Sequence, residues 1–114
     1  MSAITTHILD ISLGRPAPGV PVTLEFHAPT DEWQILGRGV TDADGRVKDL
    51  LTAGSQLTPG SYRLTFDTGA YFAALNVDGF YPAVTVSFTI RDATQHYHVP
   101  LLLSPFGYST YRGS

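Results

Sequence analysis

The sequence is built from short segments in which apolar and polar residues alternate, and turn-forming residues separate these segments at short intervals. One segment, 61–67, carries Tyr62, Leu64 and Phe66 on a single face. Alternation with a period of two is typical of a strand with one buried face. Clusters of glycine, proline and aspartate between the segments end each strand. Regular repetition of this pattern predicts an all-β fold.

Seven or eight strands and one short helix are expected. The strand candidates are 5–10, 20–27, 33–40, 47–51, 61–67, 84–91, 96–104 and 108–112, with the weakest pattern at 47–51. The segment 68–75 differs, because Tyr71, Phe72 and Leu75 recur at helical spacing after a capping Asp67 or Thr68. One short helix cannot cover a sheet, so the strands must bury their apolar faces against each other. The sequence therefore predicts a two-sheet β-sandwich.

Composition excludes several classes of protein. The chain has 114 residues, which predicts a single domain over 1–114. A net charge of -3, with one lysine and scattered arginines, argues against a nucleic-acid partner. The absence of cysteine excludes a disulfide framework and a thiolate nucleophile. No apolar run approaches the roughly 18 residues of a membrane span, and the first residues do not form a secretion signal. We therefore expect no membrane partner and a cytoplasm or an organelle as the compartment.

Three histidines are candidates for a site. His96 and His98 are two residues apart in a predicted strand and so share a face, while His7 shares a face with Thr5 and Leu9. A lone histidine on a strand is more often structural, but two imidazoles on one face bury badly unless they line a polar cavity. Proton exchange near neutral pH and a three-histidine zinc site both fit this pattern. Spacing alone does not show that His7 and His98 meet.

Two other motifs have competing interpretations. Arg46 follows the turn 42–45, where an arginine is usually a solvated surface charge. A calcium loop does not fit that turn, because its glycine falls fourth rather than sixth and Ala53 stands where a bidentate glutamate is needed. The segment 107–111 is similar to a nucleophile elbow but lacks the second glycine and the following helix. A serine hydrolase is therefore disfavoured.

Four motifs together resemble the 5-hydroxyisourate hydrolases, the enzyme branch of the transthyretin-like family. They are TTHILD at 5–10, TDADGR at 41–46, HYHVPLLLSP at 96–105 and YRGS at 111–114, and the resemblance covers essentially the whole chain. It implies a transthyretin-like β-sandwich whose long edge strands pair two domains into a dimer, with two dimers packed back to back as a homotetramer. It also implies pockets formed where subunits meet, without a metal or another cofactor.

The resemblance further implies a reaction. The substrate would be 5-hydroxyisourate, an oxidation product of urate, whose cyclic amide is hydrolysed to 2-oxo-4-hydroxy-4-carboxy-5-ureidoimidazoline. His7 and His98 would jointly activate water and handle the proton of the departing nitrogen, with His7 preferred as the base, and Arg46 would stabilise the oxyanion. The implied substrate-binding residues are His96, Tyr111, Arg112 and Ser114.

A small-molecule carrier is the alternative, since transthyretin has the same sandwich and binds thyroid hormones without chemistry. The carrier branch lacks the early histidine, the turn arginine, the late histidine and the YRGS end. This chain has all four as His7, Arg46, His98 and 111–114, which favours the enzyme. The final Arg-Gly-Ser is not a peroxisomal signal, so we expect a bacterial cytoplasm more than a peroxisome.

Overall fold

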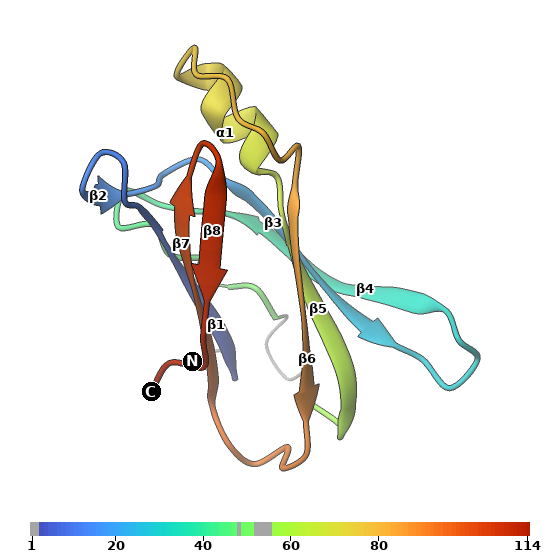
Figure 1. Cartoon of the computed structure of the whole chain (residues 1–114). Helices are drawn as coiled ribbons and strands as arrows, with labels where there is room; N and C mark the ends of the chain where they lie inside the picture. Colours follow the sequence, from blue (N-terminus) through green and yellow to red (C-terminus); the bar gives the residue numbers. More distant parts are fainter. Residues whose placement is uncertain (1–2, 48, 52–55) are drawn as a thin grey trace.

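The computed structural model describes residues 3–47, 49–51 and 56–114, which form eight strands and one helix. The elements are β1 (Ile4–Asp10), β2 (Arg15–Pro16), β3 (Pro21–His27), β4 (Trp33–Val40), β5 (Gly60–Phe66), α1 (Thr68–Ala74), β6 (Val84–Ile90), β7 (Tyr97–Ser104) and β8 (Gly107–Thr110). The order β2-β1-β7-β8 forms the first sheet and β4-β3-β5-β6 the second, and α1 lies at one end of both (Figure 1). The predicted two-sheet β-sandwich with one short helix is confirmed.

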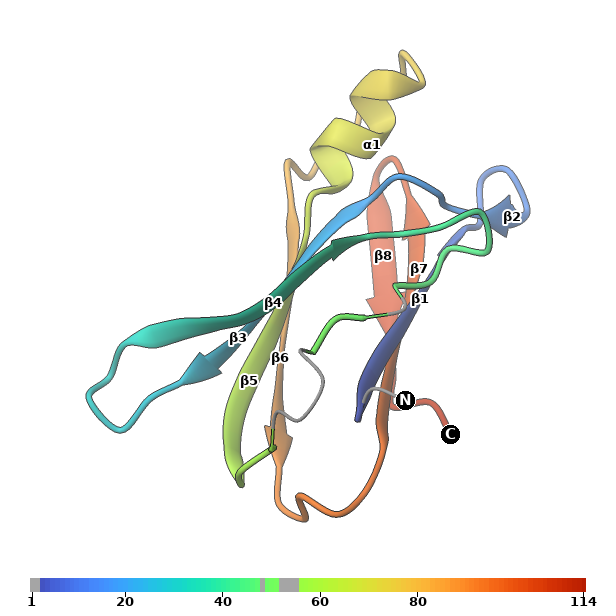
Figure 2. The same cartoon turned by 180° about the vertical axis from the view of Figure 1, so that it is seen from behind.

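The first sheet depends on a parallel pair of strands. β1 runs parallel to β7, whereas all the other neighbouring strands are antiparallel. Figure 2 shows β1 and β7 side by side in this sheet. Their register sets Thr5 opposite His98 and His7 opposite Pro100. An early and a late segment of the sequence therefore meet in the middle of one sheet.

The core lies between the two sheets. In β1 the buried residues alternate with less buried ones, and Ile4 and Ile8 are fully buried. Leu101 in β7, together with Leu24 and Leu64 in the second sheet, is buried to the same degree in one continuous apolar cluster. Because successive side chains of a strand point to opposite faces, the other face of β1 and β7 points away from the core. That outer face is available for polar side chains.

Two sequence predictions about local structure were wrong. The described residues of 47–51 form no strand, and residue 48 lies outside the described part. Val47 and Leu50 are both buried, a spacing of three that places two side chains in the core without forming a ladder. The short strand β2 was missed, because it lies inside a segment rich in glycine and proline that indicates a turn.

Other boundaries agree with the sequence. Helix α1 begins after Asp67, whose side chain accepts a hydrogen bond from the backbone N–H of Ala70 at 3.0 Å, as expected for a cap. The final strand was predicted at 108–112 and is β8, which ends at Thr110. Among the described residues, no helix is long and apolar enough to cross a membrane.

A buried carboxylate joins β1 to α1. The Tyr71 hydroxyl donates to Asp10 Oδ2 at 2.7 Å, and the Ser12 hydroxyl and the Ser12 and Leu13 backbone N–H groups donate to Oδ1. Burial raises the pKa of Asp10, but these hydrogen bonds outweigh it and hold the pKa below the ordinary 3.8. The stability that this depressed pKa contributes is present above pH 3.8 and is lost as the pH falls through the lower folded value.

Tyr71→Phe should lower the free energy of unfolding by about 1–3 kcal/mol, because it leaves a buried carboxylate oxygen without its donor. Urea denaturation at neutral pH measures this loss. Tyr108→Phe is the matched control, since it makes the same chemical change on a side chain that is 42% exposed. Equal stabilities of the two variants would show that the contact between Tyr71 and Asp10 contributes nothing.

Candidate active site

His7 and His98 share the outer face of the first sheet. His7 lies opposite Pro100, and His98 is two residues earlier in β7, so the two histidines are diagonal neighbours on adjacent strands. Both side chains are partly exposed, whereas the alternate positions of β1 and β7 face the core. The structure therefore brings together the two histidines that spacing alone could not connect.

Arg46 joins this face from the other side of β1. It forms an antiparallel bridge with His7, and the backbone N–H of Ile8 donates to the Gly45 carbonyl at 2.8 Å. Directly paired residues on adjacent strands point to the same face, so Arg46 lies beside His7. The structure thus places all three predicted catalytic residues on one face.

The turn before Arg46 is held by its own side chains. The Asp42 carboxylate accepts hydrogen bonds from the backbone N–H groups of Asp44 at 2.9 Å and Arg46 at 3.1 Å. Gly45 has a φ of +76°, and a Cβ there would lie 2.4 Å from the Ile8 carbonyl oxygen. Only glycine combines this backbone conformation with such a close approach to β1. The turn 42–45 therefore holds Arg46 beside the outer face of the first sheet that carries His7 and His98, which we call the histidine face.

A threonine links the two late histidines. The Thr5 hydroxyl lies 2.8 Å from His98 Nδ1 and 3.0 Å from His96 Nε2. His96 is exposed and directly precedes β7, while His98 is half-buried. Thr5 is a site residue that the sequence motifs did not identify. Its position two residues before His7, on the same strand face, was the signal that could have found it.

The surroundings of His98 favour its neutral form. Burial lowers the pKa of His98 below the ordinary 6.5, and the positive charge of Arg46 and the charges of His7 and His96 lower it further. A hydrogen bond with the Thr5 backbone opposes these effects without reversing them. His98 is therefore a neutral imidazole at pH 7, with one nitrogen that can donate a proton and one that can accept.

The end of the chain runs beside β7. The backbone N–H of Gly113 donates to the His98 carbonyl at 2.8 Å, and these two residues form an antiparallel bridge. Tyr111 precedes Gly113 by two residues and therefore shares the face of His98, with 58% of its surface exposed. Ser114 is exposed next to Gly113. Of the predicted substrate-binding residues, the structure thus brings Tyr111 and His96 to the histidine face. Ser114 directly follows Gly113, the residue that pairs with His98.

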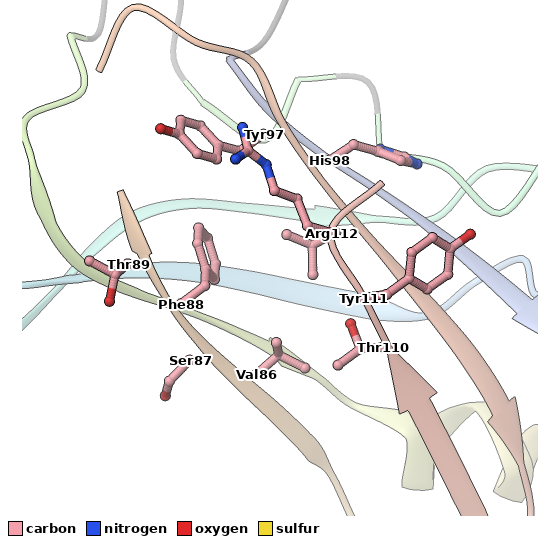
Figure 3. A pocket seen from close by; sticks show the side chains of 10 residues that line it. Val86, Ser87, Phe88, Thr89, Tyr97, His98, Thr110, Tyr111 and Arg112 are labelled. Carbon is pink, nitrogen blue, oxygen red and sulfur yellow. The ribbon is translucent and has the colours of Figure 1, made fainter. Parts of the chain in front are cut away.

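Arg112 points the other way. Its Nη2 donates to Gln95 Oε1 at 2.8 Å, and its guanidinium lies 4.5 Å from the centre of the Tyr97 ring. Figure 3 shows Arg112 extending toward Tyr97, while Tyr111 and His98 lie on the opposite side of the strand. This region is a cleft of about 240 Å³ between the edge strand β6 and the chain end. His98 and Arg112 both line this cleft, but the Arg112 side chain contacts Gln95 and Tyr97, and His7 is not part of the lining.

The zinc alternative finds no support in the side chains that the structure describes. Within residues 3–47, 49–51 and 56–114, no group of three or more His, Asp or Glu is arranged to hold a metal ion. His96 and His98 instead direct one nitrogen each to the same hydroxyl.

The sequence profile of the HIUase/Transthyretin family matches residues 4–113. This chain belongs to the HIUase/Transthyretin family. It is 49% identical to a mouse (Mus musculus) 5-hydroxyisourate hydrolase, over 99% of this chain and 96% of the mouse protein. The chain that carries His7, Arg46 and His98 is therefore similar over its full length to a protein named as a 5-hydroxyisourate hydrolase.

Two solved structures of the family are similar to this fold. The 5-hydroxyisourate hydrolase of Klebsiella pneumoniae has a TM-score of 0.84 and 41% identity, covering 97% of this chain and 98% of the other. Sea bream transthyretin in complex with thyroxine has a TM-score of 0.91 and 34% identity, covering 98% and 95%. The predicted transthyretin-like fold is confirmed. Because an enzyme and a hormone-binding protein both match, the fold does not decide the function.

Gly113→Ala should displace the His98 ring. A Cβ at position 113 would lie 2.6 Å from His98 Cδ2 and 3.2 Å from Pro100 Cγ, which is too close for both groups to stay in place. Gly107→Ala is the matched control, since its Cβ would meet only Ser104 Oγ at 3.8 Å. The imidazole resonances of His98 in NMR spectra should shift in the first variant and remain in the second. Unchanged His98 resonances in Gly113→Ala would contradict the close packing.

Proposed function

We propose that this chain hydrolyses 5-hydroxyisourate at its cyclic amide bond to give 2-oxo-4-hydroxy-4-carboxy-5-ureidoimidazoline. The convergence of His7, Arg46 and His98 on one open face of the first sheet is the observation that carries this function. Two imidazoles that can act as acid and base, next to a fixed cation, are what the hydrolysis of an amide by water requires. The full-length similarity to enzymes with this activity supports the same substrate.

The reaction divides between the three groups. His7 takes a proton from water as the water oxygen attacks the amide carbon, and the carbonyl oxygen becomes an oxyanion. Arg46 stabilises that oxyanion through its planar fork of N–H donors. When the C–N bond breaks, its electron pair stays on the ring nitrogen. That nitrogen takes a proton from one nitrogen of His98 while the other His98 nitrogen gains a proton, and His7 then releases the proton that it took from water. The neutral state of His98 at pH 7 suits a group that both gives and takes a proton.

The remaining residues would position the substrate. Tyr111 and Ser114 border the histidine face from the chain end, where a phenol and a hydroxyl can hydrogen-bond the polar edges of a urate-like ring. His96 lies behind Thr5 at the exposed side of the site. Arg112 stays a proposed substrate contact, and it requires the side chain to leave Gln95 and Tyr97.

The same proposal includes a homotetramer. β6 and β8 are edge strands whose outer backbone groups have no neighbouring strand within the described chain, so they suit edge-to-edge pairing of two copies. Ile11, Leu13 and Phe106 are 57%, 50% and 73% exposed. Exposed apolar side chains of this size suit a second contact between copies. Two such contacts with twofold symmetry give a dimer of dimers.

A carrier without catalysis is the second candidate, and the match to a thyroxine-binding transthyretin favours it. One assay separates the two functions. The protein is added to freshly generated 5-hydroxyisourate, and the decay of absorbance is compared with that in buffer. Accelerated decay supports the hydrolase, whereas binding of the compound with an unchanged rate supports the carrier.

His7→Asn and His98→Asn should each lower kcat by roughly a hundredfold or more, the usual scale for lost acid-base catalysis. His27→Asn is the control, because His27 lies on the second sheet and pairs with Asp31 at 2.7 Å. Steady-state kinetics and a melting curve for each variant make the test. A histidine whose replacement leaves the rate intact has no part in the reaction.

Arg46→Lys should cost at least about 1 kcal/mol of transition-state stabilisation, which is roughly a fivefold loss in kcat/KM. Lysine keeps the charge but loses the two-point contact of the guanidinium. Arg38→Lys serves as the control on an exposed arginine of β4. Unaltered kinetics of Arg46→Lys would identify Arg46 as a solvated turn residue.

A further inference from the structure

The Thr5 hydroxyl occupies an unusual position between two imidazoles. It lies within hydrogen-bond distance of His98 Nδ1 and of His96 Nε2, and it comes from β1, whereas His98 lies in β7 and His96 directly before it. A threonine hydroxyl has a single proton to donate and lone pairs to accept with. If both contacts are hydrogen bonds, Thr5 either donates to one histidine and accepts from the other, or accepts from both and directs its own proton elsewhere.

With both rings neutral, two arrangements of the protons place the Thr5 proton itself in one of the two hydrogen bonds. In the first, His98 Nδ1–H donates to Thr5 and Thr5 donates to His96 Nε2, so both histidines carry their proton on Nδ1. In the second, His96 Nε2–H donates to Thr5 and Thr5 donates to His98 Nδ1, so both carry it on Nε2. In these two arrangements the rings share the same tautomer, whereas they differ when Thr5 accepts from both.

We propose that Thr5 is a positioning residue that couples the tautomers of His98 and His96, so that a proton leaving His98 Nε2 is replaced from solvent through His96. This inference rests on the proposed function, because the proton from His98 is the one that the departing ring nitrogen receives. Thr5 itself does not contact the reacting atoms. It acts through the nitrogen of His98 that faces away from them.

Each group in the chain from His96 through Thr5 to His98 gains one proton for each proton that it gives. The chain begins with both histidines protonated on Nε2, and His98 Nε2–H passes its proton to the ring nitrogen. The Thr5 proton moves to His98 Nδ1, the His96 Nε2 proton moves to the Thr5 oxygen, and water delivers a proton to His96 Nδ1. Both histidines end as Nδ1–H tautomers, and no imidazolate forms. The reverse shift resets the chain when His98 Nε2 takes back a proton from water or from His7, and His96 Nδ1 returns its proton to solvent.

The burial of His98 and the exposure of His96 agree with a proton that moves from solvent through His96 to His98. His98 is half-buried, and the nearby guanidinium of Arg46 opposes a second positive charge on its ring. His98 therefore donates best as a neutral ring, and a neutral ring can give up its proton only if its other nitrogen gains one. His96 is exposed, so water reaches its ring directly. Thr5 connects the two sites.

The test compares Thr5→Val, which keeps the shape but removes the hydroxyl, with Thr5→Ser, which keeps the hydroxyl. Valine is β-branched like threonine, and serine is smaller, so both fit the half-buried strand position of Thr5. Nitrogen-15 NMR of the imidazoles, without substrate, reports the tautomer of each histidine. His96→Gln should change the tautomer of His98 in the wild-type and Thr5→Ser backgrounds and leave it unchanged in Thr5→Val. A His98 tautomer that ignores His96 in every background overturns the coupling.

Kinetics test the consequence for turnover. Thr5→Val should lower kcat about tenfold or more with little change in KM, and Thr5→Ser should restore most of the rate, because only the hydroxyl is needed. A serine variant as slow as the valine variant, or a valine variant with wild-type kcat, overturns the relay. Failure of the proposed function would be recognised separately, since wild-type protein would then not accelerate the decay of 5-hydroxyisourate at all. The NMR comparison decides the coupling in that case too.

Discussion

The parallel pairing of β1 with β7 is the contact on which the site depends. It sets Thr5 opposite His98 and His7 opposite Pro100, and so joins the beginning of the sequence to its final quarter. A register shift of one residue would turn His7 toward the core and a core residue toward solvent. The apolar residues on the inner face of β1 oppose such a shift, because Ile4 and Ile8 would lose their buried positions. Hydrophobic packing on one face thus fixes the positions of His7 and His98 on the other.

Environment decides what each histidine can do. His27 lies 2.7 Å from the Asp31 carboxylate and stacks on the Trp33 ring, so its contacts are those of a surface residue. His98 is instead surrounded by a guanidinium and two other imidazoles, and its Nδ1 meets a hydroxyl rather than a carboxylate. The same kind of side chain is therefore paired with a carboxylate at one position, whereas at the other burial and nearby positive charge lower its pKa. The second setting is the one that suits proton exchange at pH 7.

The sequence predicted most strands and the shared face of His96 and His98, and the same patterns explain where its predictions failed. Alternation predicted the strands well because each buries one face, and the shared face of His96 and His98 followed from their spacing. The segment 47–51 was misread because Val47 and Leu50 are apolar for core packing alone. The motif at the chain end predicted a pocket for all its members, but strand alternation turns Arg112 away from the face that Tyr111 occupies. The contacts of Thr5 depend on the register between β1 and β7, which spacing within one segment does not reveal.

The two ends of β1 have different roles, since one end anchors the strand and the other carries residues of the candidate site. Its last residue, Asp10, is buried and receives hydrogen bonds from α1 and from the following turn, which anchors this end of the strand. Its earlier residues, Thr5 and His7, are partly exposed and belong to the site. A rigid strand held at one end and paired on both sides can keep Thr5 and His7 in place without burying them. Groups that exchange protons must reach water and also keep a fixed geometry, and this strand meets both requirements.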